Sequence, residues 1–69
     1  MKVGVRNQIE GEVINIKKGG VMAQVQVRIS GNSTMDSVMT IDSFNDLGIK
    51  IGDKVKVAAK AVNVILMKD

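Results

Sequence analysis

The chain has 69 residues, a formal net charge of +3 and 45% hydrophobic residues, and it contains no His, Cys, Trp or Tyr. The missing imidazoles and thiols exclude most general acid–base, thiol-nucleophile and imidazole or thiolate metal chemistry. A chain this short has a thin core, so its high apolar content indicates burial between subunits. We expect one domain over residues 1–69 that binds a ligand, with no catalytic residue and no cofactor.

The first half of the chain has the period-two alternation that is typical of half-buried strands. Residues 21–29 alternate cleanly between apolar and polar side chains, and residues 8–17 alternate in part. Lys18, Gly19 and Gly20 form the turn between them, which predicts a hairpin. Gly11 inside the first strand indicates a sharp bend or a close approach by another backbone.

Three further strands and one helical turn follow. After a turn at residues 30–33, residues 35–41 predict a third strand. Ser43 then has the spacing of a helix N-cap with acidic Asp46 three residues later, and Gly48 ends that turn. Residues 54–60 and 62–67 predict the last two strands. The sequence therefore predicts an all-β fold, a small five-stranded barrel like the oligonucleotide-binding fold, with one short helical turn before strand four.

Other ligand classes have weaker support in the sequence. Basic barrels of this size bind single-stranded nucleic acid on aromatic platforms, but Phe44 is the one aromatic residue and is expected in the core. The aspartates lack the spacing of a calcium loop, so no metal site is expected. The longest apolar run falls short of the roughly 20 residues of a membrane span, which favours a cytoplasmic protein without membrane contact. Nucleic-acid binding by an OB-like module is kept as the alternative function.

Four side chains stand out because all of them donate hydrogen bonds: Arg6, Thr40, Ser43 and Lys60. Each has an ordinary explanation when it is considered alone. Arg6 and Lys60 could be solvated surface cations, Thr40 suits a strand, and Ser43 could only cap the helical turn. Taken together, two cations would neutralise a dianion, and hydroxyl and N–H groups would fill its remaining lone pairs.

Motifs along essentially the whole chain resemble the molbindins, a family of small cytoplasmic molybdate-binding proteins. They comprise Arg6-Asn7-Gln8 within residues 5–13, the Lys-Lys-Gly-Gly turn within residues 17–25, residues 40–43 and 47–52, and Lys60-Ala61 within residues 57–62. The resemblance implies the five-stranded barrel, a hexamer built as a trimer of dimers, and oxyanion sites at subunit interfaces.

The resemblance also implies which residues hold the anion. In one site, a first subunit would supply Arg6 and the backbone of Gly4 and Val5. A second subunit would supply Thr40, Ser43, Lys60 and the backbone of Ala61. A second anion site, near the threefold axis, would involve Asn7 and the turn Gly19, Gly20 and Val21. Gly4 and Ala61 stand where the family usually or often has serine, so two hydroxyl donors are absent here.

The expected function is cytoplasmic binding of molybdate or tungstate for storage or homeostasis. Molybdate at neutral pH is a dianion without a proton, and a pocket of donors suits it. The proton of hydrogen phosphate would find no acceptor in such a pocket, and leaving that buried group unpaired costs about 1–3 kcal/mol. Asp42 is the one nearby acid, and its carboxylate must face away from the anion. A ligand-sensing interaction module ranks lower, and an enzyme ranks lowest.

Overall fold

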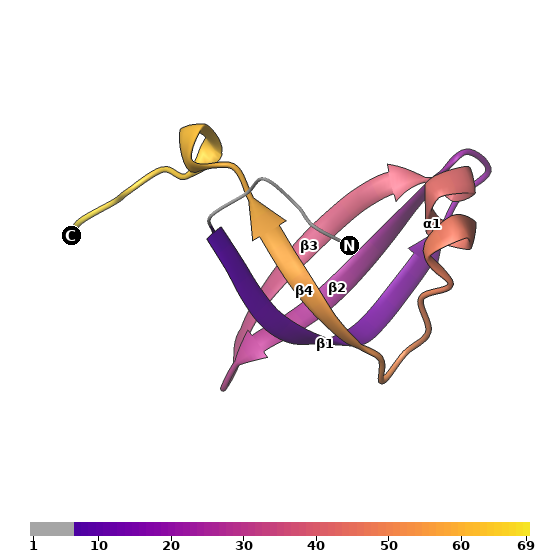
Figure 1. Cartoon of the computed structure of the whole chain (residues 1–69), viewed down its shortest axis with the longest axis horizontal. Helices are drawn as coiled ribbons and strands as arrows, with labels where there is room; N and C mark the ends of the chain where they lie inside the picture. Colours follow the sequence, from indigo (N-terminus) through magenta and orange to yellow (C-terminus); the bar gives the residue numbers. More distant parts are fainter. Residues whose placement is uncertain (1–6) are drawn as a thin grey trace.

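The computed structural model describes residues 7–69 and contains one antiparallel sheet, one short helix and one 3₁₀ turn (Figure 1). In chain order the elements are β1 (Asn7–Lys18), β2 (Met22–Ser30), β3 (Ser33–Thr40), α1 (Ile41–Leu47), β4 (Lys54–Ala59) and the 3₁₀ turn η1 (Ala61–Asn63). The strand order is β3-β2-β1-β4. Within the described residues β3 and β4 are therefore the two edges of an open sheet.

Strand β1 joins the two halves of the sheet. Its first half, from Asn7 to Glu12, pairs with β4, and its second half, from Glu12 to Lys18, pairs with β2. Gly11 lies near this crossover, close to the Arg28 carbonyl and to Val27, where a side chain would collide. The close backbone approach predicted from Gly11 is confirmed, and the sheet can curl there because no side chain intervenes.

The core fills the concave side of the curled sheet. Among the described residues, five side chains are buried: Val13, Ala23, Val25, Val27 and Phe44. Three of them are alternate residues of β2, which confirms the predicted inward face of that strand. Phe44 reaches the core from α1, so the helix covers one end of the sheet.

Helix α1 begins three residues earlier than predicted. Thr40, and not Ser43, is the N-cap, because the Thr40 side chain accepts a hydrogen bond from the backbone N–H of Ser43. Ser43 lies within the helix, so its predicted capping role was wrong. The predicted end is confirmed: Gly48 adopts φ 66° and ψ 33°, a left-handed conformation that glycine accepts without strain.

The predicted fifth strand, residues 62–67, does not join the sheet. The chain leaves β4 through η1, and residues 64–69 then run away from the sheet as an exposed segment (Figure 1). A strand needs a partner to satisfy its backbone groups, and this segment pairs with no described strand. Within residues 7–69 the sheet accordingly has four strands, and the predicted closed five-stranded barrel is not confirmed. Across residues 7–69, no helix has the length and apolarity to span a bilayer.

Candidate functional site

A pair of hydroxyl groups lies where β3 passes into α1. The Thr40 hydroxyl accepts from the Ser43 backbone N–H at 3.1 Å and donates to the Ser43 hydroxyl oxygen at 3.0 Å. Both residues are exposed. Thr40 therefore uses its hydroxyl to start the helix, while Ser43 keeps its own hydroxyl proton free to donate to a ligand.

The glycine turn between β1 and β2 meets the start of α1. The Ile41 backbone N–H donates to the Val21 carbonyl at 2.8 Å, and Gly19 closes the turn by donating to the Met22 carbonyl at 2.8 Å. Neither Gly20 nor Val21 donates its own backbone N–H to another described residue. We call this region the capping end of the molecule; its residues are Gly19, Gly20, Val21, Thr40 and Ser43.

Lys18 adds a positive charge at the capping end. Its ammonium nitrogen lies 5.0 Å from the centroid of the Phe44 ring, within the range of a cation–π contact. Phe44 itself is only 5% exposed, which confirms the core role predicted for it. The one aromatic ring of the chain therefore does not form a platform for stacking a base.

A second group of predicted site residues lies where β4 ends. Asn7 pairs with Ala59, so Lys60 directly follows the last pair of the β1–β4 ladder. The Lys60 carbonyl accepts from the Asn63 N–H at 2.9 Å, and the Ala61 carbonyl accepts from the Val64 N–H at 3.2 Å, which fixes η1. We call this region the lysine end; its residues are Asn7, Lys60 and Ala61, and all three are exposed.

The two ends lie in separate parts of one chain, with α1 at one side of the molecule and η1 at the other (Figure 1). The fold brings Thr40 together with Ser43, and both with the glycine turn. It does not bring Lys60 to Thr40, nor Asn7 to the glycine turn. Gly4, Val5 and Arg6, the remaining predicted residues, lie outside the described residues.

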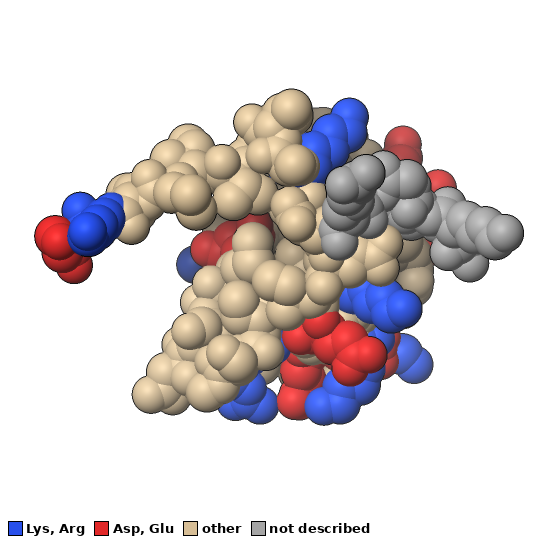
Figure 2. Space-filling view, turned by 60° about the vertical axis from the view of Figure 1, so that its left-hand side comes forward, with Lys and Arg blue, Asp and Glu red and all other residues tan. Residues whose placement is uncertain are grey.

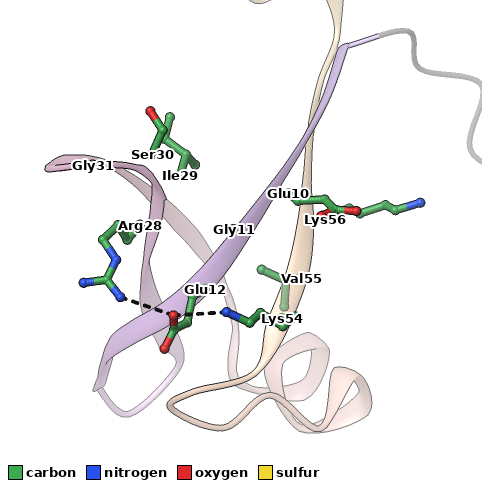
Figure 3. Close-up of a pocket in the computed structure, with 10 residues that line it drawn as sticks. All are labelled: Glu10, Gly11, Glu12, Arg28, Ile29, Ser30, Gly31, Lys54, Val55 and Lys56. Carbon is green, nitrogen blue, oxygen red and sulfur yellow. Dashed lines mark hydrogen bonds and ion pairs between the residues drawn. The ribbon is translucent and has the colours of Figure 1, made fainter.

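The structure also contains a cavity of about 530 Å³ that the sequence did not indicate. Figure 3 shows it between the tip of the β2–β3 hairpin and the start of β4, with Glu12 placed between Arg28 and Lys54. Both cations lie 3.2 Å from the same Glu12 oxygen. Lys54 first, and Arg28 second, hold the pKa of the Glu12 carboxyl below its ordinary value. The strand register was the missing signal, since Glu12 pairs with both cations across the ladders.

Charges of both signs are interleaved over the face in Figure 2 and form no continuous basic surface there. A basic stripe is the electrostatic footprint of nucleic-acid binding, so this face does not favour that alternative. Residues 7–69 contain no group of three acidic, His or Cys residues that could hold a metal ion. Asp42 is exposed in the first turn of α1 and makes no ion pair with another described residue.

Comparison with known proteins identifies close relatives. Residues 5–66 match the TOBE domain. Molybdenum-pterin-binding protein 3 of Clostridium pasteurianum is 36% identical over 67 residues, which cover 97% of this chain and 98% of that protein. A molybdate-binding protein from Sporomusa ovata has a similar structure, with a TM-score of 0.90 and 38% identity over 99% of this chain and 100% of that one.

A longer relative has the same fold in part of its length. The cytoplasmic molybdate-binding protein ModG, in a structure with molybdate bound, gives a TM-score of 0.79 at 33% identity. The match covers 88% of this chain and 43% of that chain. With a domain match over most of its length and relatives that it covers almost end to end, the chain belongs to the TOBE-domain family of molybdenum-pterin-binding proteins.

Proposed function

We propose that this protein binds molybdate, and also tungstate, as an oxyanion at the interfaces of a homo-oligomer, for storage or homeostasis in the cytoplasm. Relatives named for molybdate binding and the all-donor chemistry of the site residues support the ligand. No catalytic step is proposed, and the relatives are themselves named as binding proteins.

The anion is a better ligand for this chain than a pterin ring. A flat heterocycle is usually held by stacking on aromatic side chains. The sequence has one aromatic residue, Phe44, which is buried and has Lys18 over its ring. The hydroxyl of Ser43 and the N–H groups of Gly20 and Val21 instead suit the oxygens of an anion.

The observation that carries the proposal is the division of the site residues between two ends of one chain. Thr40 and Ser43 lie at the capping end, whereas Lys60 and Ala61 lie at the lysine end. One small anion cannot touch both ends of the same copy. We therefore assign the hydroxyls and the lysine of each site to different copies, within the hexamer that the family resemblance implies. Asn7 and the glycine turn would meet in the same way at the second site.

Calorimetric titration of the ligand-free protein tests the ligand. Molybdate and tungstate should bind with similar affinity, sulfate more weakly and phosphate weakest, because hydrogen phosphate would place a proton against donors. A free pterin should give no heat of binding. Phosphate binding as tight as molybdate binding would rule out the donor-only site.

Complementation between variants tests the shared interface. Ser43→Ala and Lys60→Ala chains are refolded separately and as an equal mixture, and molybdate binding is measured in each sample. If each site takes Ser43 and Lys60 from different copies, random mixing restores about one site in four with both residues intact. If both residues came from the same copy, no mixed oligomer would contain an intact site, and binding by the mixture would equal the mean of the two variants.

A further inference from the structure

The face of the sheet opposite the core contains a small polar hollow. It has a volume of about 140 Å³ and lies across three neighbouring strands, β1, β2 and β3 (Figure 1). Every side chain that lines it is polar or charged, and the two from β2 are half-buried. We call it the amide hollow; its residues are Asn15, Lys17, Gln24, Gln26 and Asp36.

A β-bulge in β1 brings these side chains to one face. The register of β1 against β2 shifts between Val13 and Asn15, so Ile14 is the extra residue of the bulge. Asn15 therefore pairs with outward-facing Gln26, whereas in an unbroken register it would pair with the buried Val25. Bulges re-aim the side chains that follow them and are over-represented next to functional sites.

The hollow contains polar groups that the chain does not pair internally. The carbonyl oxygen of the Asn15 side chain accepts from the Ile16 backbone N–H at 3.0 Å, so the amide nitrogen of Asn15 remains available to donate. The other four side chains of the hollow make no hydrogen bond and no ion pair with a described residue. The hollow therefore offers both donors and acceptors to a ligand.

Charges of opposite sign lie on opposite sides of the hollow. Lys17 is on β1 and Asp36 is on β3, so their backbones lie two strand spacings apart, about 9.5 Å across the sheet. Lys17 and Asp36 form no ion pair, whereas Glu12, elsewhere on β1, has both of its cations at 3.2 Å. The hollow thus keeps a cation and a carboxylate apart, with amide groups between them.

This set of groups differs from the donor-only set proposed for the oxyanion. The Asp36 carboxylate would repel an anion placed beside it. A metal ion is no better a ligand, because no group of three acidic, His or Cys residues occurs within residues 7–69. A cation, a carboxylate and amides that both donate and accept suit a molecule with one anionic end and one cationic end.

We propose that the amide hollow binds a free α-amino acid with a small side chain, in its zwitterionic form. The carboxylate of the ligand lies against the Lys17 ammonium, and its ammonium lies against the Asp36 carboxylate. The amides of Gln24 and Gln26 bond the polar atoms between these ends. A hollow of 140 Å³ holds the volume of roughly five water molecules at about 30 Å³ each, which suits an amino acid as small as serine.

The five residues belong to one chain, and none of them is assigned to the proposed oxyanion site. The inference therefore does not rest on molybdate binding or on assembly, and its test is run both without and with molybdate.

The test is a titration of the isotope-labelled full chain with L-serine, followed by nuclear magnetic resonance. The side-chain amides of Asn15, Gln24 and Gln26 give signals of their own, and these should shift saturably with a dissociation constant in the millimolar range. Ethanolamine lacks the carboxylate of serine, and 3-hydroxypropionate lacks its ammonium. Each should bind at least tenfold more weakly than L-serine, because one charge-assisted hydrogen bond is lost.

Variants then locate the two ends of the ligand. Lys17→Met and Asp36→Asn each remove one charge at nearly constant shape, and each should weaken L-serine binding at least tenfold. Lys56→Met and Asp46→Asn are the matched controls on β4 and α1, and both should bind L-serine like the original chain. All four positions are exposed, so the variants should fold, and thermal unfolding checks this.

Saturating molybdate should leave L-serine binding unchanged. Loss of the serine-induced shifts under molybdate, together with unchanged binding by Lys17→Met, would place serine in the oxyanion site and overturn the inference. Shifts that do not saturate, or ethanolamine that binds as tightly as L-serine, would also contradict a zwitterion site. Failure of molybdate itself to bind would count against the proposed function and would leave the serine result standing.

Discussion

Gly11 on β1 lies so close to Val27 on β2 that a Cβ at position 11 would overlap the Val27 Cγ1 atom, and it would also lie 3.0 Å from the Arg28 carbonyl oxygen. The Val27 side chain is buried, with 4% of its surface exposed, so it has little room to move. The curl of the sheet therefore depends on a missing side chain at this crossover of β1.

Gly11→Ala should lower the free energy of unfolding by about 1–3 kcal/mol, the usual cost of overpacking a core. Chemical denaturation followed by circular dichroism measures it. Gly20→Ala is the control, because no heavy atom lies within 4 Å of its Cβ position, and its effect should stay within about 0.5 kcal/mol. Equal stability of the two variants would mean that β2 yields at Val27.

Ser43→Ala should weaken molybdate binding by about 1.5–3 kcal/mol, the value of a hydrogen bond to a charged group. Its unfolding free energy should change little, since Thr40 and not Ser43 caps the helix. Calorimetry and thermal unfolding on the same samples separate the two effects. Ser37→Ala, an exposed hydroxyl in the middle of β3, is the control and should change neither quantity.

Lys60→Ala should weaken molybdate binding by a similar amount, about 1.5–3 kcal/mol, through loss of a charge-assisted hydrogen bond. Lys17→Ala removes an exposed lysine at the far end of β1 and should have little effect. Both variants are titrated at the same ionic strength, so that salt screening affects both binding free energies equally. A larger loss in Lys17→Ala than in Lys60→Ala would move the site away from the lysine end.

Molybdate should strengthen the oligomer if its sites are shared between copies. A ligand held only by the assembled state stabilises that state by about 2.7 kcal/mol per site at a hundredfold excess over its dissociation constant. Oligomers should then persist to lower protein concentration and melt at higher temperature with molybdate than without it. Sedimentation across a dilution series measures this, and a monomer with undiminished affinity would exclude shared sites.

Glu12 predicts how stability changes in acid. Lys54 and Arg28 lower its pKa in the folded chain, so the ion cluster stabilises the fold above the ordinary pKa near 4.5, and that contribution is lost as the pH falls through the lowered value. Glu12→Gln should therefore melt below the original protein at pH 7, and the difference should shrink as the pH falls below 4.5. The difference should stay small throughout because the cluster is exposed. Glu10→Gln, which removes a carboxylate outside that cluster, should show no such convergence.

The sequence predicted the local features of the fold well. Alternation located β1 and β2, and the strands expected at residues 35–41 and 54–60 correspond to β3 and β4. Two glycines indicated the close approach at Gly11 and the helix end at Gly48. The helix cap was misplaced because Thr40 and Ser43 are both good N-caps, and only the end of β3 decides between them. The apolar run at 62–67 predicted a strand, but within the described residues it forms η1 and an extended segment outside the sheet.

The sequence selected a set of candidate site residues but did not indicate where in the fold they lie. Composition and resemblance selected Thr40, Ser43 and Lys60, yet their distribution over two ends of the chain follows from strand order and register. The Glu12 ion cluster was missed for the same reason, since its members are far apart in sequence and meet only across the ladders. The placement of Arg6 stays a prediction.

The Thr40 hydroxyl caps α1 and also orients Ser43, so one oxygen serves both folding and the candidate site. Because Thr40 has both roles, substitutions that change the ligand preference are easier to accept at position 43 than at position 40. Position 43 can exchange side chains to suit a larger or smaller anion without loosening the helix. At position 40, few residues other than serine, aspartate or asparagine can cap the helix. Aspartate and asparagine would each bring an acceptor oxygen toward a ligand that needs donors.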